Sequence, residues 1–221
     1  MLGGDVFLMF RSFADESDNT FLTDAQVQEY LIQGHREYRN IVNAIDPGIY
    51  LTSKTFTITS NTQDLTTLVP PLAGAAAIGP TKMDRLIRVA RIDTEASDTV
   101  IEYLTPAPNE QDVPVFGYCL KGNSIVFGGA SSGSYRLEYD PVFDYSNVFV
   151  GATSAKYIDD LDAFHVIIVL LALQYYAIRD GAASAEVNAQ LGLRRRELER
   201  YLTEGRHQTA SQHVLSADYN Y

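Results

Sequence analysis

The sequence predicts an α+β protein: a helical bundle made from both ends of the chain, with a small antiparallel β-sandwich or barrel inserted between them. Two patterns predict this class. Apolar residues recur at helical spacing over 23–45 and about 160–204, whereas residues from about 48 to 145 alternate with the period of two typical of strands. We therefore expect four parts, namely an N-terminal helical part (1–47), a β module (48–145), C-terminal helices that complete the bundle (146–206) and an extended, flexible tail (207–221).

The N-terminal part begins with a short apolar pattern. Val6, Met9, Phe10 and Phe13 lie at i, i+3, i+4 and i+7, which predicts one buried face of a short helix. Residues 7–8 are also apolar, so a strand is the alternative.

A longer amphipathic helix is predicted over 23–45. Thr23 and Gln26 fit a capping box, in which Thr23 is the N-cap and the Gln26 side chain reaches back to it. The apolar stripe misses one turn at Gly34, and Pro47 ends the helix because its ring cannot continue the hydrogen-bond ladder. The stripe consists of Val27, Tyr30, Leu31, Tyr38, Ile41, Val42 and Ile45.

The middle of the chain is rich in alternating β-branched and aromatic residues, as strands are. Gly122 lies in a hairpin turn, and the glycine- and serine-rich residues 128–134 form a looser one. Residues 69–80 are apolar but interrupted by proline and glycine, so we expect a long loop that is either covered by another surface or tucked onto its own module. The predicted strands are 54–59, 86–92, 99–104, 115–120, 124–127 and 135–139.

In the C-terminal part, the sequence pattern predicts two helices, at about 163–179 and 185–204, with a break near Gly181. One long kinked helix is the alternative, since a glycine costs only about 1 kcal/mol in a helix. Residues 166–173 are all apolar, but a bilayer span needs about 20 such residues. We therefore expect a buried helix rather than a membrane anchor.

Composition narrows the function classes. The net charge is −11, and residues 181–221 hold five acidic and five basic side chains, so the acidic excess lies in 1–180. This charge argues against tight wrapping of DNA or an anionic membrane. Cys119 is the only cysteine, expected in the core, so an internal disulfide is excluded. The N-terminus lacks a secretory signal, and we expect a protein made and used on the cytosolic side.

No motif predicts a catalytic, cofactor or metal site, and we expect neither a cofactor nor enzymatic activity. His35 is expected on a helix flank, and His165 as a structural residue whose hydrogen bonds are satisfied. Asp159, Asp160 and Asp162 precede a helix, where capping is a simpler interpretation than a cation site.

Two segments are candidates for contact with partners. Arg194, Arg195 and Arg196 are followed by Glu197, and consecutive helical residues point about 100° apart, so they do not form a single patch. We interpret these four residues as a solvated face or a subunit interface, with DNA contact as the alternative. The tail cannot build a core, and its anchors for folding onto a partner are Val214, Leu215, Tyr219 and Tyr221; a mobile end without a role is the alternative.

Several stretches carry a family resemblance. Residues 15–38, with Thr23-Asp24-Ala25-Gln26 at the helix start, resemble the first helix of tailed-bacteriophage head–tail connector (adaptor) proteins. Those proteins often have an Asn-x-Ala-like helix centre, where this chain has Gln33-Gly34-His35. Residues 122–141 look like the end of the β insert found in many of them, and the helix opening at Phe164 looks like their packing helices.

The resemblance implies a structural virion protein at the phage neck, assembled in the host cytoplasm. Such connectors form a ring of about a dozen copies, a dodecamer, beneath the portal protein. The ring extends the DNA ejection channel, through which DNA passes without specific binding, and offers a platform to tail, stopper or nozzle proteins. The family's C-terminal segment commonly reaches the portal, which implies the same role for Val214, Leu215, Tyr219 and Tyr221; no membrane is involved.

Two other functional classes are alternatives to a connector. The first is a β-sandwich binding module, such as a fibre or carbohydrate-recognition component with a helical attachment region, and the absence of tryptophan counts against it. The second is an enzyme, which would need a convergent set of acid, base or nucleophile that no motif displays.

Overall fold

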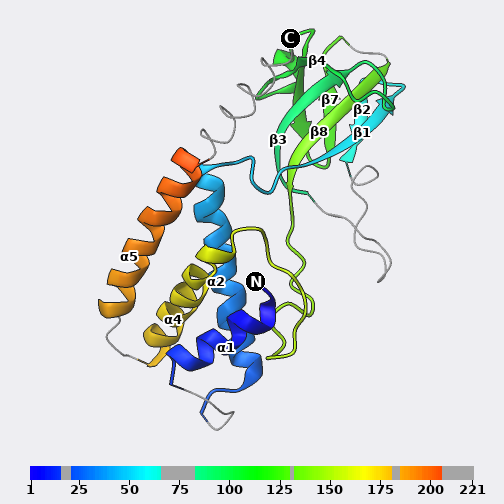
Figure 1. Ribbon diagram of the computed structural model, residues 1–221. Coiled ribbons are helices and arrows are strands. Elements are labelled where there is room, and N and C mark those ends of the chain that lie inside the picture. The colour runs from blue at the N-terminus through cyan, green and yellow to red at the C-terminus, as the bar shows by residue number, and fades with distance from the viewer. Residues whose placement is uncertain (16–20, 66–82, 130–131, 181–184, 206–221) are drawn as a thin grey trace, which may run out of the picture. The chain divides into compact units, whose positions relative to one another are not determined.

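The chain divides into two compact units, one from both ends of the sequence and one from its middle. The computed structural model describes residues 1–15, 21–65, 83–129, 132–180 and 185–205. The helical unit comprises Met1–Ile49 and Asp144–Tyr221, and the β unit comprises Tyr50–Phe143 (Figure 1). The predicted β module covers nearly the same range, 48–145.

The described residues form a mixed α+β fold, which confirms the predicted class at this level. They contain four α-helices and two four-stranded sheets whose strand pairs are mostly antiparallel. Neither sheet closes on itself, so the barrel alternative is wrong.

The helix α1 (Gly3–Phe13) forms as predicted, so the strand alternative is wrong, but its buried face is rotated from the expected one. Val6 and Phe10 are fully buried and Phe7 is 3% exposed, whereas Phe13 is 50% exposed. The i, i+3, i+4, i+7 spacing therefore predicted the helix correctly, but it wrongly placed Phe13 on the buried face.

The helix α2 (Asp24–Ile45) begins where the capping box predicts. The backbone N–H of Gln26 donates to the hydroxyl of Thr23 (3.3 Å), and the backbone N–H of Thr23 donates to the side-chain oxygen of Gln26 (3.0 Å). Asp46, directly before Pro47, has left helical geometry, as expected for a residue that precedes proline.

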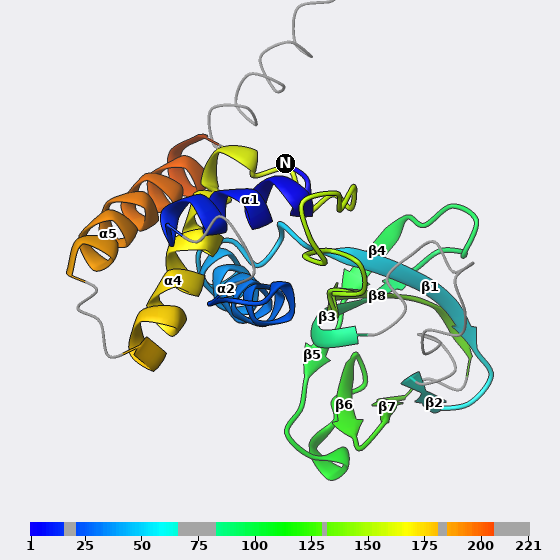
Figure 2. The same ribbon diagram turned by 90° about the horizontal axis from the view of Figure 1, so that it is seen from below.

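The helix α4 (Val166–Asp180) is the centre of the helical unit and contacts α1, α2 and α5 (Ala185–Arg200), as Figure 2 shows. It follows the short 3-10 helix η2 (Asp162–Phe164), and α5 continues into a π-helical turn, η3 (Tyr201–Gly205). Each residue of 167–173 is at most 7% exposed, so the prediction of a buried helix is confirmed. By length and composition alone, Asp162–Arg179 could cross a membrane, and 44% of it is buried within the protein.

The helices α4 and α5 fold back on one another as an antiparallel pair. The ring of Phe164, before α4, lies 5.2 Å from the ring of Tyr201, after α5. At the other end Gln174 donates to the side chain of Asn188, although a continuous helix would separate residues 14 apart by about 21 Å. The alternative of one long kinked helix is therefore wrong.

Gly34 explains the gap in the apolar stripe of α2. It is buried, and a Cβ atom at this position would lie 2.5 Å from the carbonyl oxygen of Ile168 and 2.9 Å from the backbone nitrogen of Ala172. The missing side chain thus allows the backbones of α2 and α4 to approach closely. The gap in the apolar stripe is therefore required by the packing of these two helices.

The β unit contains two sheets with the strand orders β1-β8-β3-β4 and β2-β7-β6-β5. A short 3-10 helix, η1 (Glu110–Asp112), precedes β6. Every predicted strand is present; β2 and β5 were missed because they are only three and two residues long. The strands are β1 (Thr52–Ile58), β2 (Thr62–Asp64), β3 (Met83–Ile92), β4 (Val100–Tyr103), β5 (Thr105–Pro106), β6 (Gly117–Lys121), β7 (Ser124–Phe127) and β8 (Gly133–Pro141).

One apolar core is shared by both sheets. Phe56 of β1 and Tyr135 of β8 come from the first sheet, and Ile125 and Phe127 of β7 come from the second. Gly122 has a φ of +59° at the first central position of the β6–β7 hairpin, where glycine is favoured because it lacks a Cβ. The apolar segment 69–80 lies outside the described residues, so neither interpretation of it is tested.

Candidate functional site

The outer face of α5 is the first candidate surface. Among its described side chains only Leu191 and Leu198 are buried, a narrower stripe than the typical apolar face of a helix in a globular protein. Leu202 in η3 is also buried, whereas Tyr201 is 53% exposed. Most of α5 is therefore free to meet a partner.

The predicted arginine cluster on α5 points in several directions, as consecutive helical residues do. Arg194 pairs with Glu197 at the surface (2.8 Å), and the Nε of Arg196 donates to the carbonyl of Gly192 (3.1 Å). Arg195 instead turns inward and pairs with Glu37 of α2 (2.9 Å). The four residues do not act as one group: Arg195 joins two helices of the same chain, and the others remain at the surface.

Glu37 is a polar junction that sequence reasoning missed. One of its carboxylate oxygens accepts from Arg195 of α5, and the other accepts from the hydroxyl of Tyr175 of α4 (3.0 Å). Nearby in the same unit, Arg179 donates to the hydroxyl of Tyr30 (2.9 Å). These partners are more than 130 residues apart in the sequence, so no local pattern could have revealed them.

An apolar groove lies where the end of α1 meets α4 and α5. It has a volume of about 260 Å³, and Phe13, Leu170, Leu173 and Val187 line it together with the polar residues Glu186 and Gln190. Phe13 is half exposed, which is unusual for a phenylalanine beside a well-filled core. Other large apolar side chains exposed on these helices are Leu8 (51%), Ile178 (75%) and Leu193 (50%).

The two described histidines are buried inside the helical unit. His35 is 1% exposed, so its prediction as a flank residue is wrong; its Nδ1 lies 3.0 Å from the hydroxyl of Tyr145. Burial lowers the pKa of His35 to about 3, and the positive charge of Arg39 contributes. The imidazole is thus neutral at physiological pH, and its role is to pack in the core of the helical unit.

His165 is fully buried and its Nε2 lies 2.5 Å from the carboxylate of Asp159, but its Nδ1 makes no hydrogen bond to any described residue, so the prediction that its hydrogen bonds are satisfied holds for one ring nitrogen only. The neighbouring aspartates have separate partners: Asp160 accepts from the hydroxyl of Tyr157 (3.2 Å), and Asp162 pairs with the amino group of Met1. Within the described ranges, no three histidine, cysteine or acidic residues are grouped to hold a metal ion. Cys119 is buried in β6, as predicted.

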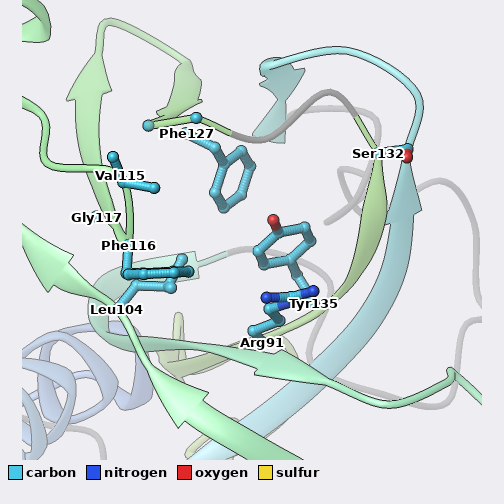
Figure 3. A pocket seen from close by; sticks show the side chains of 10 residues that line it. Arg91, Leu104, Val115, Phe116, Gly117, Phe127, Ser132 and Tyr135 are labelled. Atoms are coloured by element: carbon cyan, nitrogen blue, oxygen red, sulfur yellow. The ribbon is translucent and has the colours of Figure 1, made fainter.

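The β unit contains a second concave site, a cavity of about 160 Å³ (Figure 3). Arg91 of β3 and Tyr135 of β8 stand directly opposite one another in the antiparallel register. The rings of Phe127 and Phe116 line the cavity, and Figure 3 shows the hydroxyl of Tyr135 on the side of Phe127, with the guanidinium of Arg91 by the opposite end of the tyrosine ring. No sequence motif marked this site, because its residues come from four separate segments.

The predicted portal-binding residues Val214, Leu215, Tyr219 and Tyr221 lie outside the described residues, as does the whole tail 207–221. No protein-family model and no curated protein matches the chain.

Proposed function

We propose that this protein is a structural connector of a bacteriophage virion, which assembles into a ring beneath the portal through its helical unit. The observation that carries the proposal is the set of large apolar side chains left exposed on the helices around the 260 Å³ groove. Exposed apolar patches on a folded domain typically mark a protein interface. A second copy of the chain is the occupant that we propose for the groove.

The charges on α5 favour contact between copies. Arg194 and Glu197 form an exposed pair, as do Arg200 and Glu204 (2.8 Å each). Exposed pairs contribute little within one chain, so either member can exchange its partner for a residue of a neighbouring copy at small cost. In this proposal the helices form a bundle, and the two sheets of the β unit form a small sandwich.

The tail supplies the attachment to the portal in this proposal. Val214, Leu215, Tyr219 and Tyr221 are the side chains that bind there, as in the family that the sequence resembles. The net charge of −11 suits a channel wall, since DNA must slide along it without being held by lysine or arginine. Tail, stopper or nozzle proteins would attach on the opposite side.

Assembly is tested by mass photometry and negative-stain microscopy of the purified chain. We expect closed rings or concentration-dependent oligomers from the wild type, and monomers from a Phe13→Asp, Val187→Asp double variant, because two carboxylates would be desolvated in the interface. The matched control is Ile101→Asp, which changes a residue of β4 with similar exposure (56%) and should leave assembly unchanged.

A monomeric wild type at every concentration, or rings that persist in the double variant, would contradict the assembly mode. Attachment is tested separately by deleting residues 208–221. The shortened protein should form the same oligomers but no longer co-purify with the portal; undiminished co-purification would refute the role of the tail alone.

A further inference from the structure

The cavity of the β unit is lined by a tyrosine, Tyr135, whose hydroxyl is not used to hold the fold together. The side chain of Tyr135 is only 3% exposed, and its ring packs against Phe127 at 4.4 Å between centroids. Its hydroxyl makes no hydrogen bond to any residue in the described part of the chain. Because Tyr135 lines the cavity, this hydroxyl is accessible to a ligand that enters it, and binding such a ligand requires no hydrogen bond of the fold to be broken.

Arg91 gives the cavity a positive charge. Its guanidinium has one charged neighbour, Glu102 of β4, at 3.5 Å, which is long for an ion pair, and both side chains are partly exposed. In the antiparallel register, Arg91 of β3 stands opposite Glu102 of β4 on one side and opposite Tyr135 of β8 on the other. An incoming anion can therefore bind Arg91 from the cavity side while Glu102 keeps its position.

The backbone keeps the cavity open and rigid. A Cβ atom on Gly128 would lie 1.8 Å from the carbonyl oxygen of Pro114, so only glycine allows the 113–116 segment to pack there. This packing places Val115 (66% exposed) and Phe116 (55% exposed) beside the cavity. The lining thus combines apolar side chains with polar atoms, and more of its accessible surface is polar than apolar.

We propose that this cavity binds a carboxylate carried on a compact aromatic or apolar body, with Arg91 as the cation and the Tyr135 hydroxyl as a hydrogen-bond donor. The volume of about 160 Å³ sets the size. It is close to the roughly 150 Å³ of an engineered cavity that holds benzene, and well below the roughly 300 Å³ at which drug-sized sites begin. Burial raises the pKa of Tyr135, which keeps the hydroxyl protonated and able to donate.

Two sources could supply this group: a free small aromatic acid, or the acidic end of a residue presented by a partner protein. The site does not depend on the proposed connector role, because every residue in it belongs to the β unit. Ligand-observed ¹⁹F NMR suits the test, since it works whether the chain is a monomer or a large ring.

The probe is 4-fluorobenzoate, and 4-fluorobenzamide is its neutral control. We expect the acid to bind, and the amide to bind at least tenfold more weakly. Arg91→Gln and Tyr135→Phe should each raise the Kd of the acid by roughly tenfold, the usual effect of losing one hydrogen bond to a charged group. Arg85→Gln, which removes an exposed arginine of β3 outside the cavity, should leave the Kd unchanged.

Tyr135→Phe also separates binding from folding. Its ring is retained and no hydrogen bond is lost, so the melting temperature should be unchanged or higher even though affinity falls. Competition by N-acetylphenylalanine, but not by its amide, would support a partner's chain end as the source, whereas competition by benzoate alone would support a free acid. Equal binding of the acid and the amide, or an unchanged Kd in Arg91→Gln, would overturn the proposal.

Discussion

The two units differ in the polar groups that they bury. The helical unit buries imidazoles, and His35 is held neutral against the hydroxyl of Tyr145. The β unit buries a carboxylate, Glu138 of β8, which is 4% exposed and pairs with Arg88 and with Arg136 (2.7 Å). The helical unit also buries one charged side chain, Arg11 (7% exposed), which pairs with Asp24 (2.6 Å).

This difference follows from the geometry of the elements. In a sheet, residues of neighbouring strands stand opposite one another, so Arg88 and Arg136 can flank Glu138 from β3 and from β8 itself. In the helical unit α2 and α4 touch through their backbones at Gly34, which leaves no room for a side chain at that contact. The helical unit should therefore be sensitive to volume and pH, and the β unit to the loss of charge.

The largest effect is expected from Gly34→Val. The atoms in the way are backbone atoms of α4, which cannot move without separating the helices, so the helical unit should lose about 4 kcal/mol or fail to fold. Hydrogen-exchange mass spectrometry should show faster exchange in peptides of α2 and α4, while those of β3 and β8 stay protected. Gly192→Ala on α5 is the control: nothing lies within 4 Å, so it should stabilise by about 0.5–1 kcal/mol.

The β unit should respond most to Glu138→Gln. The substitution leaves Arg136, 17% exposed, with only Asp98 as an ionic partner (3.2 Å), and we expect a loss of about 3 kcal/mol by urea denaturation. Glu102→Gln removes the exposed partner of Arg91 and should cost no more than about 0.5 kcal/mol. Similar losses for the two variants would show that burial of Glu138 does not matter.

The helical unit should lose stability as the pH falls below about 6.5. The pKa of His35 is about 3 in the folded protein against 6.5 in an exposed histidine, so below pH 6.5 the unfolded chain takes up a proton that the folded chain does not. The expected loss is about 1.4 kcal/mol per pH unit, or about 2 kcal/mol at pH 5.

No histidine lies in residues 50–143, so exchange in the β unit should show no such pH dependence in that range. His35→Asn should remove most of the slope between pH 6.5 and 4. Below pH 4 the wild type should weaken further, because pairing with Lys156 lowers the pKa of Asp144 to about 2 and that contribution is lost on protonation. An unchanged slope in His35→Asn would assign the pH response to another group.

The smallest expected effects on stability come from substituting two arginines of α5. Arg195→Ala removes the link to Glu37 and should cost about 1 kcal/mol, whereas Arg194→Ala, in an exposed pair, should cost only a few tenths. If the proposed ring is correct, Arg194→Ala should nevertheless weaken assembly in mass photometry. Equal thermal stability of the two variants would show that Glu37 is not a junction between α2 and α5.

Interactions between residues close in the sequence made much of the fold predictable. The Thr23–Gln26 capping box and Pro47 located both ends of α2, and alternation located every strand of four residues or more. The same reasoning misplaced Phe13 and His35, because a helix of apolar residues has several faces that could be buried and only the neighbouring helices select one.

The sequence by itself determined which segments are helices and strands, since capping, proline and periodicity act over a few residues. Only the tertiary structure decided that Gly34 is a contact with α4, that α4 and α5 fold back on each other, and that Arg91 and Tyr135 share one cavity. Those facts depend on pairs of residues 37 to 138 positions apart, from Phe164–Tyr201 to Gly34–Ala172. The free energy of such pairs depends on burial and distance, which arise only when the chain is packed.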